Sequence, residues 1–153
     1  MKNKSVILGI LIIVVVCLVT TGCGIKSAIS TEEFKQHFGA LGYTTSENEE
    51  TLYESKTYVV ASKSDVPYKI EYYEFEEEVD AKKIYKKYED NIADYLTTTS
   101  QNLTTTGALF TKFVATSDNE YIIISRVKNT IIFIAGTVGY KEEIDTLLED
   151  INY

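Results

Sequence analysis

The side chains of this chain that could perform nucleophilic, acid–base or metal chemistry are few and widely spaced. His37 is the only histidine in 153 residues, so no second imidazole can share a metal ion with it, and no serine stands in a G-x-S-x-G turn. Because a general base needs a partner within hydrogen-bond reach, we interpret His37 as a histidine on a helix surface. These residues predict neither a catalytic site nor a metal or cofactor site.

The densest group of charges is the acidic segment over residues 74–80. Carboxylates bind Ca²⁺, but the D-x-D-x-D-G pattern of a calcium loop is absent. We interpret the segment as a strand end followed by the first turn of a helix, where the helix dipole favours acidic side chains. A hydrolase acting on carbohydrate would need Glu71 or Glu74 opposite a second acid across a cleft, and this is the enzymatic alternative for the chain.

The tyrosines point to a binding function instead. Twelve tyrosines occur, and three in predicted strands, Tyr58, Tyr68 and Tyr73, are candidates for an exposed binding face. An exposed tyrosine ring can stack on a sugar or anchor a protein interface. The alternative is that these rings are half-buried in the packing of strands and helices, so their exposure decides between the two.

The N-terminus has the parts of a secretory signal. Lys2 and Lys4 precede an uncharged apolar run over residues 6–19, and small residues then lead to Cys23. This ending resembles the lipobox of bacterial lipoproteins, although Thr20 stands where that family usually has leucine. The resemblance implies cleavage before Cys23, lipidation of its sulfur by a diacylglyceryl group, and anchoring at the extracytoplasmic face of the cell membrane. Two acyl chains suffice for stable anchoring.

An uncleaved membrane helix is the alternative for this segment. Residues 5–22 are about long enough to span a bilayer, but no basic stop-transfer segment follows them. Either arrangement places the remaining chain outside the cytoplasmic membrane. We expect a signal peptide over residues 1–22, a lipidated tether over 23–30 and a single extracellular domain over 31–153.

The charge of this domain excludes nucleic acid as a partner. Losing Lys2 and Lys4 with the first 22 residues changes the formal net charge from −8 to −10. Such a surface repels phosphate backbones, and no basic patch with interleaved aromatic residues offsets it. Because Cys17 and Cys23 both belong to the N-terminal segment, the domain itself has no disulfide, thiol nucleophile or thiolate metal site.

Hydrophobic periodicity predicts three helices. The first, over residues 31–41, begins at a capping box formed by Ser30 and Glu33 and ends at Gly42. Apolar stripes predict the other two, at 81–95 and 140–151.

Segments rich in Tyr, Val, Thr and Ile predict about five strands. They lie at 52–62, 68–76, 108–116, 121–127 and 130–138. The last two are apolar on both faces and are expected to be central. Lys128 and Asn129 form a plausible two-residue turn between them, with Asn129 at positive φ.

Two polar stretches are predicted to be loops, 46–50 and the Thr-rich segment 97–107, which is either a mobile connection or a recognition loop. The resulting order, α-β-β-α-β-β-β-α, has hairpins rather than parallel crossovers. We therefore expect an α+β domain in two layers, with an antiparallel sheet of about five strands and three helices packed on it.

These observations together predict a membrane-anchored lipoprotein that presents a small non-enzymatic binding domain at the cell surface. In size, acidity and the segment 68–88, the domain resembles small lipid-anchored proteins of Gram-positive bacteria whose extracellular domains have no assigned activity. An envelope protein or the wall glycan is the expected partner. The alternative is a small cell-envelope hydrolase that acts on carbohydrate through paired carboxylates.

Overall fold

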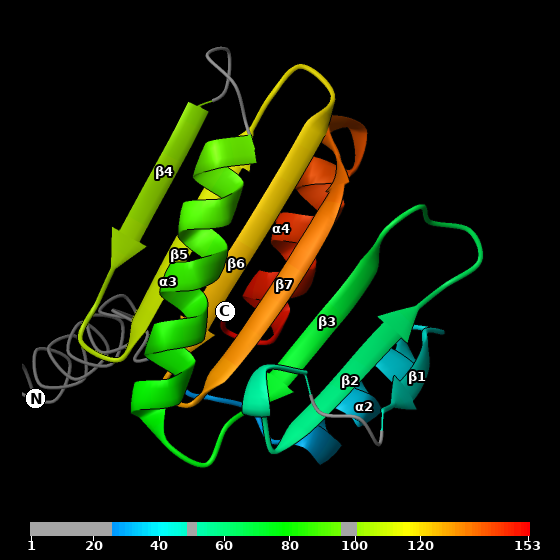
Figure 1. The fold of residues 1–153 in the computed structure, drawn as a ribbon. Helices are drawn as coiled ribbons and strands as arrows, with labels where there is room; N and C mark the ends of the chain where they lie inside the picture. Colours follow the sequence, from blue (N-terminus) through cyan, green and yellow to red (C-terminus); the bar gives the residue numbers. More distant parts are fainter. Residues whose placement is uncertain (1–25, 49–51, 96–100) are drawn as a thin grey trace, which may run out of the picture.

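The computed structural model describes residues 26–48, 52–95 and 101–153. Within these ranges the chain forms three α-helices and one seven-stranded sheet, in which all neighbouring strands are antiparallel (Figure 1). The predicted signal peptide and Cys23 lie outside the described residues.

The helices are α2 (Thr31–Ala40), α3 (Glu78–Tyr95) and α4 (Lys141–Asp150), and short 3₁₀ turns lie at η1 (Leu52–Glu54) and η2 (Val138–Tyr140). The strands are β1 (Thr44–Glu47), β2 (Thr57–Ser62), β3 (Lys69–Glu74), β4 (Gln101–Thr106), β5 (Phe110–Thr116), β6 (Glu120–Val127) and β7 (Thr130–Thr137). Their spatial order is β1-β2-β3-β7-β6-β5-β4, so β6 and β7 lie inside the sheet, as predicted.

The prediction of about five strands in the order α-β-β-α-β-β-β-α is wrong. The described chain has seven, in the order α-β-β-β-α-β-β-β-β-α. The two missed strands, β1 and β4, are the two edges of the sheet, and all six side chains of β4 are exposed. A strand without a buried face needs no apolar alternation. The predicted loops 46–50 and 97–107 therefore contain part of β1 and all of β4, which pair through their backbones instead.

Helices cover both faces of the sheet, so the domain has three layers rather than the predicted two. Tyr72 and Tyr73 are neighbours on β3 and are both fully buried, but they belong to opposite cores because strand side chains alternate between faces. The core with Tyr72 contains α2 and α4, and the core with Tyr73 contains α3. Figure 1 shows α3 in front of the sheet and the other two helices behind it.

Several local predictions are confirmed. Ser30 and Glu33 form the capping box, in which the Glu33 backbone N–H donates to Ser30 Oγ at 3.3 Å and the Ser30 N–H to Glu33 Oε2 at 2.7 Å. Gly42, directly after the C-cap of α2, has a φ of +83°. These residues therefore fix both ends of α2 as the sequence indicated.

The two-residue turn between β6 and β7 is confirmed, but its conformation differs from the prediction. Val127 pairs with Thr130 across the turn, and Lys128 rather than Asn129 has the positive φ, at 52°. Asn129 instead bonds Phe75 twice: its side-chain amide donates to the Phe75 carbonyl at 2.7 Å, and its own carbonyl accepts from the Phe75 N–H at 2.9 Å. These bonds tie the turn to the segment that leads into α3.

The segment before α2, predicted as a tether, is attached to the domain from Lys26 onward. Ala28 and Ile29 pack against the core that contains α2 and α4. The Tyr72 hydroxyl donates to the Ile29 carbonyl at 2.8 Å, and Lys26 lies over the Phe110 ring at 5.4 Å from its centroid. The N-terminal segment therefore reaches the domain on the sheet face covered by α2 and α4.

We expect Gly42→Ala to lower the free energy of unfolding by about 1 kcal/mol, since an alanine resists positive φ. An added Cβ would meet nothing closer than Lys63 Cε at 3.6 Å, so the cost comes from the backbone. Gly39→Ala is the matched control, because a Cβ there meets nothing within 4 Å and alanine favours helix. Urea unfolding followed by circular dichroism should give a lower midpoint for Gly42→Ala only. Equal midpoints would contradict this account of the helix end.

Candidate functional site

The three tyrosines predicted to bind do not form a common exposed face. Tyr68 and Tyr73 are 1% and 0% exposed, and they lie in the two cores on opposite sides of the sheet. Tyr58 is half-buried, with its ring stacked on that of Tyr73 at a centroid distance of 4.8 Å. Neither face of the Tyr68 or Tyr73 ring is open to a partner.

The hydroxyls of the two buried tyrosines are held by carboxylates. Tyr68 donates to Glu143 at 2.5 Å and lies 3.0 Å from the Tyr43 hydroxyl, while Tyr73 donates to Glu71. Burial, followed by the bond to the carboxylate, raises the pKa of both phenols above the usual value. Buried tyrosines with satisfied hydroxyls are structural elements, which is the alternative that the sequence left open.

The carboxylates proposed for hydrolysis do not face other acids. The cross-strand neighbours of Glu71 are Val60 and Phe133. Those of Glu74 are Thr57 and Thr130, and its carboxylate accepts hydrogen bonds from Thr31 at 2.8 Å and Lys56 at 3.4 Å. The strand register therefore provides no paired-carboxylate cleft at these two positions.

His37 is half-buried on α2, with its ring edge-on to Phe38 at 5.1 Å between centroids. Among the described residues, no group of three or more His, Cys, Asp or Glu side chains is placed to hold a metal ion. The strongest candidate for a functional site therefore contains neither His37 nor the tyrosines and carboxylates considered above.

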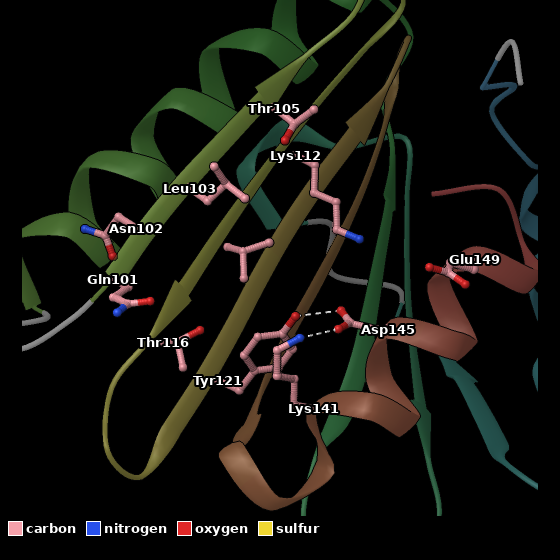
Figure 2. Close-up of a pocket in the computed structure, with 11 residues that line it drawn as sticks. Gln101, Asn102, Leu103, Thr105, Lys112, Thr116, Tyr121, Lys141, Asp145 and Glu149 are labelled. Atoms are coloured by element: carbon pink, nitrogen blue, oxygen red, sulfur yellow. Dashed lines mark hydrogen bonds and ion pairs between the residues drawn. The ribbon is translucent and has the colours of Figure 1, made fainter. Parts of the chain in front are cut away.

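That site is a groove of about 610 Å³ between the helix α4 and the outer strands of the sheet (Figure 2). Its strand wall comes from β4, β5 and β6, and its helix wall from α4. Most of the lining residues have polar side chains, but their apolar atoms also contribute to the surface of the groove. They are Gln101, Asn102, Leu103, Thr105, Lys112, Val114, Thr116, Tyr121, Lys141, Asp145 and Glu149.

One end of this lining is fixed by a hydrogen-bonded group. Asp145 accepts from the Tyr121 hydroxyl at 2.6 Å and from the Lys141 ammonium at 2.6 Å, and Lys141 also lies over the Tyr121 ring at 4.9 Å from its centroid. Burial and the bond to Asp145 raise the pKa of Tyr121. These contacts tie α4 to β6, so this wall is ordered before any ligand arrives.

Lys112 on β5 differs from the other charges of the groove because it is half-buried and unpaired. Figure 2 shows its side chain directed into the space between the strands and α4. Within the described ranges, no ion pair or side-chain hydrogen bond reaches its ammonium. Burial lowers its pKa, and the negative charges of Asp145 and Glu149 oppose that effect only in part.

A second lysine lies close to this position. Lys26 covers the ring of Phe110, two residues before Lys112 on β5. Burial lowers the pKa of Lys26, the positive charge of Lys112 lowers it further, and the negative charge of Glu149 opposes these effects only in part. Two partly desolvated ammonium groups therefore lie in this part of the domain. A bound anion would compensate the cost of their desolvation and reduce the repulsion between them.

The rest of the lining favours a polar ligand of moderate size. Gln101, Thr105 and Thr116 supply hydrogen-bond donors and acceptors, and Leu103 and Val114 supply an apolar surface. A few placed polar groups beside apolar contacts are typical of ligand sites. The arrangement is suited to binding a molecule that carries an anionic group.

Sequence reasoning missed this groove because it missed β4. The Thr-rich segment, predicted as a mobile or recognition loop, contains a strand at Gln101–Thr106, and four residues of that strand line the groove. The sequence carried one other sign of the groove. Lys112 is the only charged residue of the predicted strand 108–116, and it lies among apolar and hydroxyl residues.

Comparisons with models of protein families, with curated proteins and with solved structures found no match to this chain. No helix in the described ranges is both long and apolar enough to cross a membrane. The groove is therefore interpreted from its own geometry.

We expect Lys112→Met to raise the free energy of unfolding at pH 7 by up to about 1 kcal/mol, because it removes a partly desolvated charge. Methionine keeps the apolar stem and removes the desolvated charge. Because the pKa of Lys112 is lower in the folded state, the unfolded chain binds the proton more tightly, and wild-type stability rises with pH between the two pKa values.

The gain from Lys112→Met should therefore be largest at neutral pH and shrink as the pH rises toward 10.5. Urea midpoints across this range measure it. Lys83→Met, on an exposed position of α3, is the control and should change little. A loss of stability in Lys112→Met would show that the ammonium has a stabilising partner.

Proposed function

We propose that this protein is a lipid-anchored, non-enzymatic binding protein, held at the extracytoplasmic face of the cell membrane through Cys23. Its groove between α4 and the strands β4, β5 and β6 binds a polar ligand with an anionic group. The observation that carries this proposal is the half-buried Lys112 inside the groove, whose ammonium has no ion-pair or hydrogen-bond partner among the described residues. A charge that is partly desolvated without a partner destabilises the free protein, and a ligand anion would supply the missing partner.

The position of the N-terminal segment supports the attachment. Residues 26–29 contact the domain on the face that also carries the groove. Only two residues, Gly24 and Ile25, lie between Cys23 and Lys26, a span of about 10 Å between the two Cα atoms when extended. A lipid on Cys23 would therefore hold the groove close to the membrane surface, within reach of envelope components.

The wall glycan is the expected ligand, since its sugars combine hydroxyl and acetamido groups with carboxylates. The amide and hydroxyl side chains of β4 and β5 match the neutral groups, and Lys112 matches a carboxylate. No side chain is assigned a catalytic role, because the groove orders Asp145 through two hydrogen bonds rather than leaving it opposite a free acid.

N-acetylmuramic acid and N-acetylglucosamine are a matched pair of probes that differ in one lactyl carboxylate. We expect the acid, but not the neutral sugar, to shift amide NMR signals of Leu103, Lys112 and Asp145 when it is titrated into the full chain in detergent micelles. Lys112→Gln should weaken this binding about tenfold or more, the usual cost of losing a charge-assisted hydrogen bond.

Lys83→Gln is the control for this titration, since it removes the same charge from an exposed position on α3. It should leave the affinity unchanged. Shifts of equal size with both sugars, or an affinity unaffected by Lys112→Gln, would contradict an anion site at Lys112.

Cys23→Ser is expected to block lipidation and cleavage, because a hydroxyl cannot replace the thiol that forms the thioether. Intact mass of the membrane-extracted protein should show a wild-type chain that lacks residues 1–22 and carries acyl groups. The Cys23→Ser chain should retain residues 1–22. A wild-type protein that also retains them would favour the uncleaved membrane helix.

A further inference from the structure

In the part of the chain that the structure describes, β4 itself carries none of the features that usually protect a sheet edge, although the Thr104 hydroxyl donates to the Glu89 carboxylate of α3 at 3.0 Å. Gln101–Thr106 contains no charge and no proline, and all six of its side chains are exposed. Figure 1 shows β4 at the rim of the sheet, with β5 as its one neighbouring strand. Natural edge strands are normally short, charged, bulged or covered, because an open edge pairs with other chains.

The opposite edge is protected in this way. β1 has four residues rather than six, and it ends in Glu47, which forms an ion pair with Lys35 of α2. A charge on an edge strand opposes pairing with a second chain. The two edges of the sheet therefore differ, and only β4 is open to strand addition.

The hairpin register shows which backbone groups of β4 point outward. The Gly107 N–H donates to the Phe110 carbonyl at 2.9 Å, and hydrogen-bonded and non-hydrogen-bonded pairs alternate along an antiparallel ladder. Gln101, Leu103 and Thr105 thus bond to β5. The N–H and C=O groups of Asn102, Thr104 and Thr106 point away from the sheet.

We propose that β4 pairs in antiparallel fashion with β4 of a second copy of this chain, about a twofold axis that passes beside Thr104. In this register Thr104 faces Thr104 of the other copy, and Asn102 faces Thr106. All three outward-pointing residues of each strand then find hydrogen-bonding partners, and the two sheets join into one.

The side chains of β4 suit this self-pairing. Thr104 lies on the α3 side of the sheet, where its hydroxyl donates to Glu89 at 3.0 Å. Threonine and asparagine side chains would meet across the axis on this side, and threonine–threonine pairs are favourable between strands. On the other face, Leu103 would lie opposite Thr105 of the second copy. Leu103 is 64% exposed in the single chain, so pairing would cover part of an apolar side chain that now contacts water.

Charge favours a second copy as the occupant. The chain has a net charge of −8, yet the only charged residue between positions 101 and 117 is Lys112. The Glu89 carboxylate of α3 accepts a hydrogen bond from the Thr104 hydroxyl at 3.0 Å, and its charge is neutralised by an ion pair with Lys86 at 3.0 Å. Two acidic domains therefore repel each other least where they meet through this hairpin. The twofold axis is normal to the sheet, so residues 26–29 of both copies lie on the same face, as two chains anchored in one membrane require.

The proposed dimer depends on the backbone pairing of β4. The proposed lipid anchor would add only a higher effective concentration of the chain at the membrane. Two paired strands bury less area than most stable interfaces, so the dimer is expected to be weak in dilute solution and populated at the membrane.

Cysteine cross-linking of the full chain in membranes tests the register. Thr104→Cys should form an intermolecular disulfide on mild oxidation, because the two Cα atoms would lie about 5.5 Å apart. An equal mixture of Asn102→Cys and Thr106→Cys chains should cross-link to each other more than either does to itself. The chain without an added cysteine measures the background from Cys17 and Cys23.

Thr45→Cys is the matched control on β1. Asn48 N–H donates to the Tyr58 carbonyl, and the same alternation points the backbone of Thr45 outward from its own edge. Cross-linking at Thr104 that does not exceed cross-linking at Thr45 would overturn the proposal. The readout does not depend on the groove, so it is independent of ligand binding at Lys112.

Proline variants give a second measurement. Thr104→Pro removes an outward-pointing donor and is compatible with an edge strand, so circular dichroism should show a folded domain. Sedimentation of the full chain in detergent should show self-association weakened about tenfold or more. Thr45→Pro should leave it unchanged. A wild-type chain that is monomeric in both detergent and membranes would also overturn the proposal.

Discussion

The pairing of β3 with β7 is the constraint on which the rest of the domain depends. It joins strands about 60 residues apart in the sequence, with Tyr72 opposite Ile132 and Tyr73 opposite Ile131. Without it, the sheet would separate into β1–β3 and β4–β7. Because these residues alternate between faces, the same ladder supplies the centre of both hydrophobic cores, and a slip of one residue would exchange them.

The groove follows from the width of the sheet that this pairing creates. α4 packs against the core residues of β6 and β7, and Tyr121 and Asp145 fix its position over β6. Beyond β6, the strands β5 and β4 extend past the helix. Residues on that side of the outer hairpin therefore face a partly enclosed space, and one of them is Lys112. A wider helical layer would have buried the groove, and a narrower sheet would have removed its outer wall.

The proposed ligand groove and the proposed dimer edge share the strand β4. Its side chains Gln101, Leu103 and Thr105 line the groove, while the backbones of Asn102, Thr104 and Thr106 form the open edge. A polar strand without a buried face can serve both purposes, since neither the groove nor the edge requires apolar packing. Because β4 has no buried face of its own, its backbone pairing with β5 holds it in place. The hairpin turn at Gly107 and Phe110 therefore supports both the groove and the open edge.

The sequence by itself determined the elements whose signals are local. The Ser30–Glu33 capping box, Gly42, the apolar stripe of α3 and the two-faced apolar strands β6 and β7 were all predictable, because capping, backbone sterics and periodicity act between near neighbours. Tertiary structure alone decided that Tyr68 and Tyr73 are buried, since helices from distant segments cover them. It also made strands of β1 and β4, because an edge strand is stabilised by its neighbour's backbone rather than by its own side chains.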